Sequence, residues 1–175
     1  NRCERGASLM LTGKSAPHSS LPNMYRWKED VIWHRHPLSP KDAKRGTVGI
    51  PRVLNMYEDF PFWHAFFGRL GYRVLTSSEQ IRDISTEAME TIPSYSECFP
   101  AKLAHTHVAD LAKHHPDFIW YPCIDKGPDE GSTNSYHCPM VASYPENIEA
   151  NMDEVLGKYK VKLLHPFLPL HAQKP

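Results

Sequence analysis

Three of the four cysteines in the chain stand where a thiolate ligand would be well placed. Cys98 immediately precedes an expected helix, whose free N–H groups and positive dipole end stabilise a thiolate. Cys123 ends an expected buried strand, and Cys138 ends a polar loop that follows it. Pro122 and Pro139 adjoin two of these cysteines and fix the backbone beside them. If the strands are parallel, all three thiols start from one sheet edge, where open α/β sheets bind ligands.

Three converging thiolates suit a soft metal, and both iron–sulfur clusters and zinc meet that description. The chain has no Cys-x-x-Cys hook, which argues against a zinc finger or ribbon. Spacing alone leaves another interpretation open, because free cysteine is often buried simply as a small apolar side chain. Cys3 is a possible fourth ligand if the N-terminal part folds back. Its alternative is an exposed thiol near a chain end.

The elements expected around these cysteines alternate between strand and helix. Apolar runs predict strands within 45–54, 72–76, 117–122 and 161–164. Helical spacing and helix-start residues predict helices that begin near Pro61, at Ser77 or Ser78, after Cys98 and at Pro145. This order is typical of parallel strands with right-handed crossovers. The expected fold class is α/β with a mainly parallel sheet.

The first part of the chain lacks this regular patterning. Prolines interrupt residues 1–46 repeatedly, so we expect an irregular N-terminal arm or linker from a preceding domain. The α/β cluster-binding domain is expected at 47–171. The chain opens without Met and is interpreted as a fragment of a larger protein.

Composition excludes several classes of function. Lys plus Arg and Asp plus Glu both number 20, so no net positive field attracts nucleic acid or an anionic membrane. No apolar run is long enough to span a bilayer, and the chain does not open on a secretory signal. We therefore expect a cytoplasmic protein with neither nucleic-acid nor membrane partners. Four cysteines in 175 residues are too few for a disulfide scaffold.

Other polar residues near the cysteines have two interpretations. Lys102 lies one turn into the helix after Cys98, where it either balances the negative charge of a cluster or is an ordinary solvated lysine. His105 and His107 are two positions apart on a helix, so they face different directions and form no chelating pair. No arrangement of Ser, His and Asp indicates a catalytic triad, and no catalytic residue is assigned.

A family resemblance rests on short motifs that follow one another in order. They occupy residues 49–58 (GIPRVLNMYE), 61–63, 90–94, 98–102 (CFPAK), 121–123 (YPC), 138–139, 143–146 and 165–170. Together they resemble a domain of unknown function found in large CoA-substrate-specific enzyme activases, which are related to activators of the 2-hydroxyacyl-CoA dehydratases. The resemblance covers roughly residues 45–171, and its order makes it more specific than any single motif.

The resemblance implies a three-layer α/β/α domain with a mainly parallel, Rossmann-like sheet, akin to those of the dehydratase subunits and double-cubane cluster proteins. It also implies that Cys98, Cys123 and Cys138 hold a 4Fe–4S cluster for electron transfer. Lys102 would lie near this metal site and contribute to binding the cofactor. The implied partners are an ATP-hydrolysing activase domain of the same parent chain and a dehydratase-like subunit. The parent resembles an ATP-dependent 2-hydroxyacyl-CoA dehydratase activator. This fragment has no Walker-type phosphate loop, and we do not expect it to be catalytic alone.

Two other classes of function stay open at this point. The first is a non-catalytic docking or scaffold domain, in which the thiols are vestigial or bind zinc. The second is a domain that binds a CoA ester in a pocket between the loops 54–60 and 125–137.

Overall fold

The computed structural model describes residues 4–13, 20–127, 131 and 134–170, and the chain divides into two compact units at 1–31 and 32–175. The first unit contains the helix α1 (Glu4–Thr12) and most of α2 (Met24–Trp33). The side chain of Asn23 accepts the backbone N–H groups of Tyr25 and Arg26, both at 3.1 Å, and so caps the start of α2. The expectation of a mostly irregular arm missed these two helices.

The second unit is built on a sheet of four parallel strands. They are β1 (Thr47–Ile50), β2 (Arg73–Thr76), β3 (Phe118–Trp120) and β4 (Lys162–Leu164), in the order β2-β1-β3-β4. In register, Val48 of β1 stands between Val74 and Phe118, and Ile119 pairs with Leu163. Val48 and Ile119 are fully buried, because the sheet is covered on both faces.

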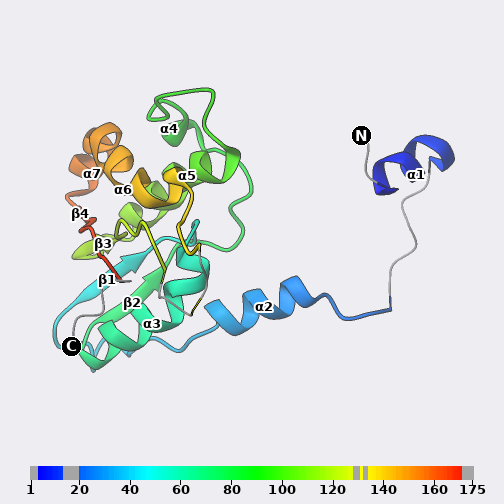
Figure 1. Cartoon of the computed structure of the whole chain (residues 1–175). Coiled ribbons are helices and arrows are strands. Elements are labelled where there is room, and N and C mark those ends of the chain that lie inside the picture. Colours follow the sequence, from blue (N-terminus) through cyan, green and yellow to red (C-terminus); the bar gives the residue numbers. More distant parts are fainter. Residues whose placement is uncertain (1–3, 14–19, 128–130, 132–133, 171–175) are drawn as a thin grey trace. The chain divides into compact units, whose positions relative to one another are not determined.

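Helices cover both faces of this sheet. They are α3 (Met56–Arg69), the short α4 (Thr86–Met89), α5 (Phe99–Lys113), α6 (Pro139–Asn151) and α7 (Asp153–Tyr159). Figure 1 shows α3 on one face and α5, α6 and α7 on the other. The predicted three-layer α/β/α class with a parallel, Rossmann-like sheet is therefore confirmed.

Two helices begin before the prolines that were predicted to start them. α3 starts at Met56 and contains Pro61 in its interior, with Glu58 and Asp59 in the first turn, where they favour the positive helix end. α6 likewise starts at Pro139, the first helical position, and continues through Pro145. The predictions that these helices begin near Pro61 and at Pro145 were wrong.

The helix predicted at Ser77 or Ser78 is also placed wrongly. The structure has a loop there, and the short α4 follows it. Ser85 is the N-cap of α4, and its hydroxyl accepts the backbone N–H of Ala88 at 3.3 Å. Ser77 is instead buried against α5, where its Oγ lies 2.7 Å from Nδ1 of His107.

Residues just before β1 belong to the core of the second unit. Trp33 is 4% exposed and stacks on Phe60 of α3, with ring centroids 4.4 Å apart. The guanidinium carbon of Arg52 lies 4.8 Å from the centre of the Trp33 ring. The end of α2 is thereby fixed to the α3 face of the sheet.

Candidate functional site

The strand order creates a topological switch point between β1 and β3. The chain leaves β1 toward β2 on one side, and leaves β3 toward β4 on the other. Open α/β sheets bind ligands beyond the carboxyl ends of the strands at such a point. The segments there are 51–55 after β1 and 121–123 after β3. Cys123 therefore lies at the edge where the fold class places a ligand.

Cys98 and Cys138 occupy equivalent places on two helices. Each is the N-cap of its helix, Cys98 on α5 and Cys138 on α6, with extended backbone and no hydrogen bond from its side chain to the helix. Both thiols are free and exposed. The prediction that Cys98 immediately precedes a helix is confirmed, and Cys138 has the same setting. Both cysteines therefore lie beside the unpaired N–H groups and the positive dipole end of a helix.

Cys123 has a different environment. It is 2% exposed, and its backbone pairs with the C-terminal segment, donating to the Pro166 carbonyl at 3.0 Å and accepting from Leu168 at 2.9 Å. Burial raises the pKa of the Cys123 thiol, and a backbone hydrogen bond from Glu146 of α6 acts in the opposite direction. Cys123 is thus a neutral, buried thiol that touches the helix capped by Cys138.

A buried hydrogen-bonded network joins α5 to α6 and begins at Glu97, next to Cys98. The hydroxyl of Tyr144 donates to Glu97 at 2.6 Å and lies 3.0 Å from Nε2 of His105, whose Nδ1 lies 2.7 Å from the Thr91 hydroxyl. Burial lowers the pKa of His105 to about 4, so its ring is neutral at pH 7. Tyr144 gives its proton to Glu97 and the Thr91 hydroxyl donates to the Ala88 carbonyl at 2.8 Å, so the neutral ring has an acceptor oxygen on each side and donates its one proton to one of them.

Two buried tyrosines connect this network to Cys123. Burial raises the pKa of Tyr144, with Glu97, Tyr121 and Cys98 adding to the effect. Burial also raises the pKa of Tyr121, and Cys123 adds to it. The Tyr121 hydroxyl is buried without a hydrogen-bond partner among the described residues. The two phenol groups therefore lie in the region between the Cys98 and Cys123 thiols.

The thiols at this edge are suitable ligands for a soft metal, but their positions in the structure do not form a metal site. Three thiols at a sheet edge, two of them at helix starts, are a suitable donor set for an iron–sulfur cluster. Among the described residues, however, no three His, Cys, Asp or Glu side chains are grouped closely enough to hold a metal ion. Cys3, the predicted possible fourth ligand, lies outside the described residues. The present arrangement is therefore not an assembled metal site.

A second polar cluster fixes the ends of β1 and β2. The Ser77 hydroxyl accepts the backbone N–H of Arg52 at 2.9 Å and contacts Nδ1 of His107 at 2.7 Å. Burial lowers the pKa of His107 to about 4, so the neutral ring accepts the serine proton. His105 and His107 bond different partners, as their spacing predicted. Ser77 is 2% exposed, which makes this Ser–His pair structural rather than nucleophilic.

The Lys102 side chain contacts other protein groups and is not simply solvated. Its ammonium donates to the backbone carbonyl of Tyr95 at 2.7 Å and lies 5.9 Å from the centre of the Tyr95 ring. These contacts place its charge at a pocket of about 610 Å³ formed with the loop between α4 and α5. The role of Lys102 toward a cluster stays a prediction.

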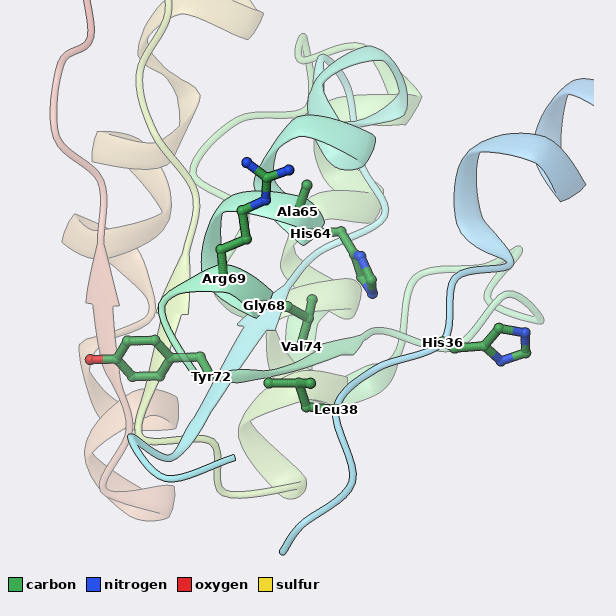
Figure 2. Close-up of a pocket in the computed structure, with 8 residues that line it drawn as sticks. All are labelled: His36, Leu38, His64, Ala65, Gly68, Arg69, Tyr72 and Val74. Carbon is green, nitrogen blue, oxygen red and sulfur yellow. The ribbon is translucent and has the colours of Figure 1, made fainter. Parts of the chain in front are cut away.

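A smaller pocket of about 190 Å³ lies beside α3 and β2 (Figure 2). His64 of α3 faces it, together with Leu38 and Val74, while the Arg69 side chain extends away from the imidazole. Nε2 of His64 is buried without a hydrogen-bond partner among the described residues. Burial lowers the pKa of His64, while a hydrogen bond with the backbone of His36 acts in the opposite direction. No sequence pattern singles this histidine out.

Sequence reasoning also missed the Glu97–Tyr144–His105 network. Glu97 and Tyr144 are far apart in the chain, and their spacing follows no motif. The available signal was the position of Glu97 directly before Cys98. The structure adds a polar, buried lining to an edge that the sequence described through its cysteines alone.

The fold and this edge define an α/β/α domain of the open, doubly wound type, with its candidate site at the carboxyl ends of the strands. The chain belongs to the family described as CoA enzyme activase uncharacterised domain (DUF2229), which matches residues 47–175. No curated protein and no solved structure matches the chain. In the part of the chain that the structure describes, every helix is too short or too polar to cross a membrane.

Proposed function

We propose that this chain is the iron–sulfur electron-transfer module of a CoA enzyme activase system. Membership of the activase domain family supports this setting. In it, Cys98, Cys123 and Cys138 hold a 4Fe–4S cluster, which supplies one-electron transfer when bound. The observation that supports the proposal is that Cys98 and Cys138 are the N-caps of two helices, while Cys123 follows the carboxyl end of β3.

The surrounding residues support a thiolate site at this edge. The starts of α5 and α6 supply unpaired N–H groups and positive dipole ends beside Cys98 and Cys138. Cys123 is poised differently, because its buried neutral thiol must lose a proton and approach the other two. The contact of Glu146 with its sulfur couples that movement to α6. Lys102 adds positive charge one turn into α5.

The proposed partner is an ATP-hydrolysing activase domain of the same parent chain, and a dehydratase-like subunit is the proposed electron acceptor. We propose a cytoplasmic setting, in which thiols stay reduced. We do not propose that the fragment alone is a catalyst. Its role is to hold and position the redox group.

Anaerobic reconstitution of the full 175-residue chain with ferrous iron and sulfide tests the proposal. We expect about four iron atoms per chain and the broad charge-transfer absorbance of a 4Fe–4S cluster. Separate Cys98→Ser, Cys123→Ser and Cys138→Ser variants should each lose most of the iron. Cys3→Ser is the matched control, because it removes a thiol that the three-cysteine site does not need.

Colourless protein without bound iron would reject the proposal. Full loading of Cys123→Ser would reject the ligand assignment, and loss of iron in Cys3→Ser would identify the fourth ligand. Circular dichroism of each apo variant separates loss of iron from loss of fold.

The second candidate is a docking or scaffold domain whose thiols are vestigial or bind zinc. The burial and raised pKa of Cys123 favour it, since a ligand thiol must be deprotonated. Zinc titration of the same apo chain, followed by metal analysis, distinguishes the two. Zinc binding that requires the three cysteines, together with failure to assemble a cluster, would support the second candidate.

A further inference from the structure

The loop that joins α4 to α5 borders a pocket of about 610 Å³, of which the proposed function uses only the charge of Lys102. Its walls include Ile84, Met89 and Ile92, and its polar groups include Ser94 and Lys102. Pockets of this size with apolar walls and few polar groups are typical of small-molecule sites. The lining therefore fits a ligand with an apolar body and one polar end.

The charge of Lys102 defines that polar end. The Tyr95 carbonyl takes one of the three ammonium protons, at 2.7 Å, and leaves two donors available. No carboxylate among the described residues pairs with Lys102. Lys102 also lies in the first turns of the 15-residue α5, whose start carries positive partial charge. An anionic group is the complement of this end of the pocket.

The apolar wall gives the rest of the ligand a place to be buried. Met89 is 60% exposed, which is high for a large apolar side chain, and Tyr95 at the rim is fully exposed. Contact with an apolar ligand would remove part of both surfaces from water, which stabilises the complex. A compact hydrophilic anion such as acetate would leave these surfaces uncovered.

We infer that this pocket binds a small carboxylate with an apolar body, whose carboxylate pairs with Lys102 and whose body lies against Met89 and Ile92. The site uses none of the three cysteines and shares only Lys102 with the proposed cluster site. The carboxylate accepts hydrogen bonds from the Lys102 ammonium.

Isothermal titration calorimetry with octanoate as the probe tests this inference on the full, iron-free chain. We expect saturable binding of octanoate, and at least about tenfold weaker binding of acetate, which lacks the body, and of 1-octanol, which lacks the charge. Lys102→Gln should weaken octanoate by about tenfold or more, and Lys102→Arg should retain most of the affinity.

Two further variants locate the site. Met89→Asp places a like charge on the exposed wall and should also weaken octanoate, while Lys113→Gln, at the far end of α5, should bind as the unaltered chain does. No heat with octanoate, equal affinity for 1-octanol, or unchanged affinity in Lys102→Gln would overturn the inference. Since the protein carries no iron, none of these outcomes bears on iron loading.

Discussion

His107 is a buried base whose protonation opposes folding. Its pKa is lowered from 6.5 to about 4 by burial, and the ring is 6% exposed. Between these two values the unfolded chain binds a proton that the folded chain excludes, so stability is fully present above pH 6.5 and decreases as the pH falls toward 4. His105, with the same lowered pKa and full burial, acts in the same direction.

We therefore predict that the free energy of unfolding falls by up to about 1.4 kcal/mol per pH unit for each of these histidines within that window. Urea denaturation between pH 7.5 and pH 4.5 measures the slope. His107→Gln should be less stable at pH 7.5, since it loses the contact with Ser77, but should show a shallower slope. An identical slope in the variant would show that His107 does not titrate in this way.

At the scale of elements, the turn into β1 depends on a glycine. Gly46 has φ of +108°, which L side chains rarely adopt, and a Cβ there would collide with the Asp117 carboxylate. That carboxylate accepts the backbone N–H of Thr47 at 2.6 Å, and the Thr47 carbonyl accepts from Asp117 at 3.0 Å. The turn thus connects the start of β1 to the segment before β3.

We predict that Gly46→Ala lowers the free energy of unfolding by about 2–3 kcal/mol, because it combines backbone strain with loss of the Asp117 contact. Gly157→Ala is the matched control: Gly157 lies inside α7 with open space around it, so alanine should stabilise the chain by about 0.5–1 kcal/mol. Chemical denaturation measures both. Equal effects of the two substitutions would contradict the role given to the turn.

At the scale of the whole molecule, the compact unit is larger than the family match. The match begins at residue 47, whereas the second compact unit begins at Ile32. Ile32 and Trp33 belong to the same apolar core as Phe60 and the buried strand residues. The segment 32–46 is therefore part of the folded unit rather than a linker.

Truncation measures this difference. We predict that a chain beginning at residue 32 keeps the stability of the second unit, whereas one beginning at 47 is several kcal/mol less stable. Trp33→Ala in the full chain should cost about 3–5 kcal/mol, since it leaves a cavity against Phe60. Thermal and urea unfolding report the result. Equal stability of the two truncated chains would show that residues 32–46 are a linker.

Much of the fold was predictable because it depends on local patterns. Apolar runs and helical spacing specified the strand–helix alternation, and the fold class followed from it. Helix starts were less predictable. Pro61 and Pro145 lie inside helices here. The Ser77 hydroxyl makes a tertiary contact with His107 instead of capping a helix. Short-range signals do not reveal such long-range competition.

The sequence by itself determined the α/β class, the family and the placement of Cys98 and Cys123 beside a helix start and a strand end. Only the tertiary structure decided that the Cys123 thiol is buried and protonated, and that Tyr144 joins Glu97 to His105. The physical reason is range. Propensity and periodicity act within a few residues, whereas burial, pKa and hydrogen bonding depend on which distant segments the sheet order brings together.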